Sequence, residues 1–202
     1  MKKLDNIELV LGKEEDGVFA ISFVENPAIE EDFVYLSSME INLSVTDSEK
    51  REVIGLALVP DKRIYRRVKD KEFNVWFSAE TIKKTAELFM ERLMGNNATT
   101  EHAEKAPDIS VIESWIVEDE KHDKSNIYKL NAPKGSWVIK TKVNNNDVWD
   151  SIKLGKYKGY SVEAKYSGME EILSAESNES EADKLLKGIE QIIKDYEQGS
   201  NS

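Results

Sequence analysis

The 202-residue chain contains no cysteine and only two histidines. The lack of cysteine excludes disulfides, thiolate metal sites and cysteine-based catalysis, and it fits a reducing compartment. No apolar run approaches the roughly 18 residues that a membrane-spanning helix needs, so we expect no membrane partner. The N-terminal lysines precede only a short apolar stretch, Ile7 to Leu11, which Glu8 interrupts. We therefore expect this segment to belong to the mature protein.

Basic residues are also scarce, with 28 Lys and Arg against 39 Asp and Glu and a net charge of −11. Nucleic-acid phosphates demand a basic surface, so we expect no nucleic-acid partner. The charge suits a partner with a basic or mixed surface. Hydrophobic residues make up 40% of the chain, enough for one domain of ordinary size with an appendage.

Segments rich in Val, Ile, Tyr, Phe and Trp, separated by Gly, Pro, Asn and Asp, predict a mainly-β body. The expected strands are Ile7–Leu11, Val18–Val24, Phe33–Val45, Glu52–Val59, Ile64–Arg67, Phe73–Phe77, Ile109–Val117, Ile127–Leu130, Trp137–Val143 and Tyr160–Tyr166. Two helices are expected among them. One spans Ala79–Met94, capped by Ser78 and stopped by Gly95, with an apolar stripe of Ile82, Ala86, Phe89, Met90 and Leu93. The other spans about Asp147–Leu154 and ends at Gly155.

The chain changes character after Tyr166. Residues 1–168 form the expected body, and residues 169–183 are acidic and predict a linker. Residues 184–202 predict a helix and tail whose apolar stripe includes Leu185, Ile189 and Tyr196. So short a helix is marginal alone in water. We therefore expect it to dock on the body, to pair with another chain, or to be the stump of a longer segment.

Histidine chemistry would have to use His102 or His122, and His122 lies among charges at an expected loop tip. Glu113 lies on an expected strand with two largely apolar faces, so its carboxylate needs a partner. One alternative is a histidine, which Glu113 would orient as the third member of a catalytic triad. The other is a salt bridge to Lys140, Lys142 or Arg67, and the sequence leaves both open.

Ser161 lies in "KGYSVEAKY", a predicted strand with Tyr160 and Val162 on one face and Ser161 and Glu163 on the other. A serine nucleophile needs an adjacent base. From spacing alone, Ser161 with His102 is one pairing among many. A metal hydrolase using both histidines and carboxylates is the weakest alternative, because no H-E-x-x-H pattern or equivalent is present.

Four stretches resemble the XkdF-like group of phage prohead serine proteases. They are "GVFAISFVENPAIEEDFVYLS", "EVIGLALVPDKRIYR", "TTEHAEKAPDISVIESWIVEDEKHDKSN" and "PKGSWVIKTKVNNNDVWDSIKLGKYKGYSVEA", in the family's order, from about Gly17 to Ala164. The resemblance implies an α+β, mainly-β fold. It would be an antiparallel β-barrel flanked by helices, like the herpesvirus assemblin proteases, with the C-terminal helical appendage added.

The resemblance also implies a serine endopeptidase that matures the phage prohead. Its partners would be capsid and scaffold proteins, its place the prohead interior in the host cytoplasm, and it would need no cofactor or metal. Ser161 falls on the family serine and His102 on the family histidine. The third member is not fixed by the match: Glu113 is placed first and Glu163 is the alternative. Self-cleavage is expected within Ile172–Ser177. The other interpretation is an inactive, protease-like assembly factor, which the C-terminal helix and the acidity also suit.

Overall fold

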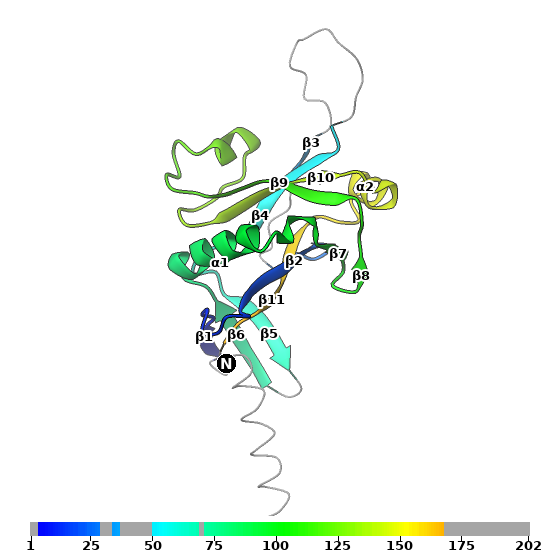
Figure 1. Cartoon of the computed structure of the whole chain (residues 1–202). Helices are drawn as coiled ribbons and strands as arrows, with labels where there is room; N and C mark the ends of the chain where they lie inside the picture. Colours follow the sequence, from blue (N-terminus) through cyan, green and yellow to red (C-terminus); the bar gives the residue numbers. More distant parts are fainter. Residues whose placement is uncertain (1–3, 29–33, 37–49, 69–70, 168–202) are drawn as a thin grey trace, which may run out of the picture.

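A computed structural model of the chain describes residues 4–28, 34–36, 50–68 and 71–167 (Figure 1). Its elements, in chain order, are β1 (Asp5–Glu8), β2 (Gly17–Val24), β3 (Val34–Leu36), β4 (Glu52–Leu58), β5 (Ile64–Val68), β6 (Lys71–Trp76), α1 (Ala79–Glu91), η1 (Met94–Asn96), β7 (Ala98–Thr100), β8 (Glu104–Lys105), β9 (Ile109–Ile116), η2 (Lys124–Tyr128), β10 (Trp137–Val143), α2 (Asn146–Lys153) and β11 (Gly159–Lys165). The expected linker and C-terminal helix, and most of the strand expected at Phe33–Val45, lie outside the described residues.

The described strands form three sheets, ordered β1-β6-β5, β3-β4-β10-β9 and β11-β2-β7-β8. Two of the strand pairs, β1 with β6 and β2 with β7, are parallel. The mainly-β fold with flanking helices is therefore confirmed, but these strands do not close into the expected antiparallel barrel. The third sheet shows why: it runs from β2 through the short β7 to the two-residue β8, which leaves an open edge.

Helix α1 packs against β2 of one sheet and against β9 and β10 of another, and Figure 1 shows it lying between them. Its cap is as expected, since the Ser78 hydroxyl accepts the Thr81 N–H at 3.3 Å. Phe89 packs edge-on against Trp137, with ring centroids 5.3 Å apart. The C-terminal part of the predicted stripe is wrong. The helix ends at Glu91, and Leu93, in a left-handed conformation with φ of 56°, is 84% exposed.

Helix α2 lies within one residue of its expected bounds at each end. The Asn145 side chain accepts the Val148 N–H at 3.0 Å, and Gly155 takes the left-handed conformation, φ 71°, that stops the helix. The strand expected at Ile127–Leu130 is wrong, because its first two residues belong to η2 and Lys129, in the left-handed conformation, ends that turn. The Asp123 carboxylate caps that turn by accepting the Ser125 N–H, and Ile127 is exposed, so no sheet needs its side chain.

A buried carboxylate ties the N-terminal loop to the end of β11. Asp16 is 3% exposed, and its Oδ2 accepts hydrogen bonds from the backbone N–H groups of Gly12, Lys13 and Ser167 and from the Ser167 hydroxyl. Burial by itself raises the pKa of this carboxyl, but these hydrogen bonds outweigh burial and hold it below its usual value. The exit from β11 is therefore fixed to the body.

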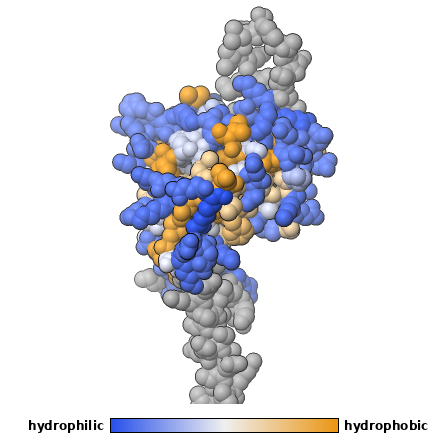
Figure 2. Space-filling view, viewed as in Figure 1, coloured by the Kyte–Doolittle hydropathy of each residue, from blue (hydrophilic) through white to orange (hydrophobic). Residues whose placement is uncertain are grey.

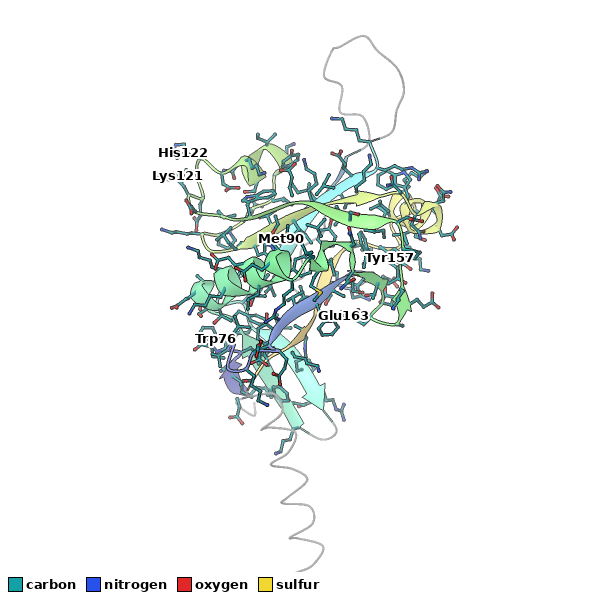
Figure 3. All side chains as sticks on the ribbon, viewed as in Figure 1. Trp76, Met90, Lys121, His122, Tyr157 and Glu163 are labelled. Atoms are coloured by element: carbon teal, nitrogen blue, oxygen red, sulfur yellow. The ribbon has the colours of Figure 1, made fainter. Side chains whose placement is uncertain are left out.

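Hydrophilic residues cover most of the face seen in Figure 2, and hydrophobic ones gather near its middle. Met90, labelled near the centre of Figure 3, is one of the exposed large hydrophobic side chains, with Phe19, Leu93 and Ile112. In the part of the chain that the structure describes, no helix is long and apolar enough to cross a membrane.

Candidate active site

Strand β11 is anchored through the tyrosine that precedes Ser161. The Tyr160 hydroxyl lies in the core, where it donates to the Val53 carbonyl at 3.0 Å and is 2.7 Å from the Thr141 hydroxyl. Its ring packs edge-on against Phe23. Burial raises the pKa of Tyr160 far above its usual value, so the hydroxyl stays protonated. Because side chains alternate along a strand, this anchor turns Ser161 to the opposite face.

Three hydroxyl residues cross the sheet in a row on that face. Ser161 of β11 lies directly opposite Ser22 of β2, which in turn is in register with Thr99 of β7. Residues paired in this way project to the same side of a sheet. Ser22 is fully buried and Ser161 is 7% exposed. The row leads from the candidate nucleophile towards the hairpin that carries His102.

His102 lies in the turn of residues 101–103 that joins β7 to β8. Glu101 and His102 both adopt left-handed backbone conformations, with φ of 48° and 57°. Hydrogen bonds to β2 hold the turn in place: the His102 N–H donates to the Ser22 hydroxyl at 3.0 Å, and the Glu101 N–H donates to the Phe23 carbonyl at 3.1 Å. The hydroxyl opposite Ser161 is thus the one that fixes the backbone of His102.

Glu163 completes the cluster from β11. It lies two residues beyond Ser161 on the same face, roughly 6.6 Å along the strand. Its Oε1 is 3.6 Å from His102 Nδ1 and accepts a short hydrogen bond from the Thr99 hydroxyl. The register of β11 against β2 shifts between Glu163 and Ala164, and such bulges re-aim side chains next to active sites. The structure therefore brings Glu163 to His102, with Ser161 two residues away on the same face of β11.

The contact between the serine and the histidine is still open. Among the described residues, the Ser161 hydroxyl makes no hydrogen bond to another side chain, and the His102 side chain is 43% exposed. In unliganded enzymes a nucleophile and its base are often more loosely spaced than in the substrate complex. The Glu163 carboxylate, the His102 imidazole and the Ser161 hydroxyl thus lie on one sheet face. The hydrogen bond between the Ser161 hydroxyl and the imidazole is not formed.

Glu113 lies in another sheet. It pairs across β9 and β10 with Lys140, and its carboxylate makes short hydrogen-bonded ion pairs with Lys140 and Lys124. These two hydrogen bonds lower the pKa of Glu113. The sequence left two kinds of partner open for Glu113, a histidine or a basic residue, and the structure shows the salt bridge to Lys140. The structure pairs His102 with Glu163 rather than with Glu113.

His122 is on a loop remote from Glu163, as Figure 3 shows. Its Nδ1 is 2.8 Å from an Asp119 oxygen and its side chain is 81% exposed, as expected of a loop tip. Among the described residues, no group of three or more His, Asp or Glu is arranged to hold a metal ion.

Two hollows adjoin β11. One, of about 180 Å³, is lined by Ser161, Val162 and Ala164 together with apolar residues of β4, β5 and β6, and by Arg66. The other, of about 440 Å³, is lined by Glu163 and Thr99, by Lys105 of β8 and by Pro107, which follows β8. Ser161 lines the first of these hollows and Glu163 the second.

The sequence did not reveal Ser22 and Thr99 as parts of this cluster. Ser22 had a signal, because it is the only hydroxyl in the apolar strand "GVFAISFV". Thr99 had no such signal in the sequence. Strands β7 and β8 are very short, and the turn between them contains no glycine or proline that would mark a hairpin. Two non-glycine residues take the left-handed conformation there instead.

Residues 40–170 match the model of a protein family described as "Putative phage serine protease XkdF". No curated protein and no solved structure matches the chain. The matched region contains both Ser161 and His102, as well as Glu163.

Proposed function

Because the chain belongs to this XkdF family of phage serine proteases, we propose that it is an endopeptidase that cleaves scaffold and capsid proteins during prohead maturation. Ser161 is the nucleophile, His102 the general base and Glu163 the group that orients the imidazole. One observation carries this proposal: the hairpin of His102 is tied through Ser22 to the strand position opposite Ser161, while Glu163 Oε1 lies 3.6 Å from His102 Nδ1.

In this mechanism the Ser161 hydroxyl attacks the carbonyl carbon of the scissile peptide, and His102 takes its proton through Nε2. Glu163, facing Nδ1, holds the tautomer in which Nε2 is free to accept and stabilises the imidazolium that forms. His102 then gives the proton to the leaving amine, and water releases the acyl group from Ser161 by the same acid–base route.

A second candidate function is a catalytically inactive, protease-like assembly protein. The observation that favours it is that, within the described residues, the Ser161 hydroxyl makes no hydrogen bond to another side chain. The two functions differ in the reactivity of the Ser161 hydroxyl. In the protease, binding of a peptide would have to bring this hydroxyl within hydrogen-bond reach of His102. Pairing between copies through residues 184–202, and self-cleavage within Ile172–Ser177, remain parts of the proposal that concern residues outside the described ranges.

The deciding experiment co-expresses the full chain with the capsid and scaffold proteins of its own phage. We expect wild-type processing to fall by about 10⁴-fold or more in Ser161→Ala and in His102→Ala, as measured by gel and mass spectrometry of the products. Thermal unfolding checks that both variants are folded. Processing that persists in both variants would refute the protease, and processing absent from the wild type, with Ser161 inert to a serine-directed phosphonate, would favour the assembly protein.

A further inference from the structure

Glu163 reaches across a neighbouring strand to meet the hairpin that carries His102. In the sheet ordered β11-β2-β7-β8, strand β2 separates Glu163 of β11 from this hairpin of β7 and β8. Adjacent strands lie about 4.8 Å apart, so the gap from β11 to β7 is roughly two such spacings. The residue opposite Glu163 on β2 is Ala20, whose small methyl group leaves room above the strand. Ala20, Thr99 and Glu163 accordingly line the same hollow.

Thr99 holds the far end of this long side chain. Its hydroxyl donates a short hydrogen bond to Glu163 Oε1, the oxygen that lies 3.6 Å from His102 Nδ1. Among the residues that the structure describes, no other group forms a hydrogen bond with the Glu163 carboxylate. A glutamate side chain has several rotamers, so without an anchor the carboxylate would sample positions away from the imidazole. One hydroxyl therefore decides where the carboxylate lies.

The Thr99 hydroxyl is itself well fixed. Thr99 is in register with Ser22 of β2 on one side and with Lys105 of β8 on the other. Threonine is branched at Cβ, which restricts its χ1 rotamers. Because the same hairpin carries His102, an oxygen held by Thr99 keeps its place relative to the imidazole.

We propose that Thr99 is a positioning residue, which holds the Glu163 carboxylate beside His102 Nδ1 through its hydroxyl. The inference rests on the proposed function, because it assigns a further residue to the same site. Thr99 acts through Glu163 and touches neither the substrate nor the reacting atoms. Its hydroxyl links β11, which supplies the carboxylate, to the hairpin that supplies the imidazole, although β11 and β7 are not neighbours in the sheet.

Kinetics of closely matched variants test this role. Thr99→Val keeps the shape of the side chain and removes the donor, so we expect kcat to fall on the order of 10-fold with KM nearly unchanged. Thr99→Ser keeps the donor and should stay within about threefold of the wild type. Thr100→Val is the matched control and should leave kcat unchanged, because the Thr100 side chain projects to the opposite face of the sheet. The substrate is a fluorogenic peptide copied from a cleavage site found in the co-expression experiment, and thermal unfolding checks that each variant is folded.

A double-mutant cycle separates positioning from a purely structural role. If Thr99 acts through Glu163, Thr99→Val should cost no further activity in a chain that already carries Glu163→Ala. An equal loss of kcat in both backgrounds, or a Thr99→Val variant with the wild-type kcat, would overturn the proposal.

NMR of the imidazole nitrogens keeps failure of the inference distinct from failure of the proposed function. The chain has only two histidines, so long-range proton–nitrogen spectra of the full chain with Ser161→Ala report on both, and the remote His122 is the internal reference. At a pH where the imidazole is neutral, we expect His102 to carry its proton on Nδ1, facing the Glu163 carboxylate. Adding Thr99→Val should shift this proton towards Nε2, and adding Thr99→Ser should not.

The outcomes of this measurement do not depend on catalysis. A His102 tautomer that is the same with Thr99→Val, or a parent chain whose His102 proton is on Nε2, would overturn the role of Thr99. If Ser161 of the wild type is inert to a serine-directed phosphonate while the His102 tautomer still depends on Thr99, only the protease is overturned.

Discussion

Glu113 and Glu163 are both glutamates on strands, yet their surroundings give them opposite uses. Glu113 lies between the ammonium groups of Lys124 and Lys140, so its charge is compensated and it holds β9, β10 and η2 together. Glu163 faces the Thr99 hydroxyl and the His102 imidazole, which carries a charge only when protonated. A carboxylate between two cations serves structure, whereas one that meets a titratable imidazole is able to orient and stabilise it during proton transfer.

The largest effect that separates the two glutamates concerns activity. Glu163→Gln keeps the shape and the acceptor for Thr99 but removes the charge beside His102. We expect kcat/KM for a peptide substrate to fall by about 10²- to 10⁴-fold, because the imidazole loses the group that fixes its tautomer. Steady-state kinetics measure this, with thermal unfolding as the check on folding.

Glu113→Gln is the matched control for that variant, since it makes the same chemical change on another sheet. Its kcat/KM should stay within about twofold of the wild type, because the wild-type carboxylate is engaged by lysines. The reverse result, with Glu113→Gln inactive and Glu163→Gln active, would restore Glu113 as the third member.

A smaller effect is expected from the hydroxyl that supports the His102 turn. Ser22→Ala leaves the His102 N–H without its acceptor and loosens a turn that two left-handed residues already strain. We expect kcat to fall about tenfold with KM nearly unchanged, since the histidine and not the peptide is displaced. Ser136→Ala is the control: that serine is also fully buried, but its hydroxyl has no hydrogen-bond partner among the described residues, so kcat should not change.

The smallest effect is the stability lost in Glu113→Gln. Lys140 is left nearly buried without its anion, but Glu113 itself is 35% exposed, so we expect a loss of about 1 kcal/mol in the free energy of unfolding at neutral pH. The pKa of Glu113 is lowered in the folded state. The Glu113 charge therefore contributes fully to the free energy of unfolding above its unfolded-state pKa of about 4.3. This contribution disappears as the pH falls through the lower pKa of the folded state.

Denaturant titrations at several pH values check this last prediction. The difference in the free energy of unfolding between wild type and Glu113→Gln should be constant above about pH 5.5. It should disappear on acidification below about pH 4. A gap that persists at low pH would mean that packing, rather than charge, carries the interaction. Glu163→Gln should show no comparable loss of stability, because no lysine depends on Glu163 among the described residues.

Long, strongly patterned segments of this chain were predictable. The strand predicted at Trp137–Val143 has the observed bounds, and those predicted for β2, β4 and β9 agree to within one residue. Runs of β-branched and aromatic residues bounded by turn residues leave few alternatives. The C-terminal end of α1 could not be predicted from the sequence. Met90 and Leu93 continue the apolar pattern of the helix, although both side chains are exposed. Periodicity reports which residues would share a face, not whether that face is covered.

The sequence by itself determined the kinds of residue available for chemistry. With no cysteine and two histidines, and with resemblance to one protease family, it singled out Ser161 and His102 and left Glu113 and Glu163 as alternatives. Only the tertiary structure decided which glutamate meets the histidine. That contact depends on the register of β2 between β11 and β7, and on a short hairpin whose position is set by hydrogen bonds to Ser22 and Phe23. Such pairings join residues far apart in the chain, and local propensity carries no information about them.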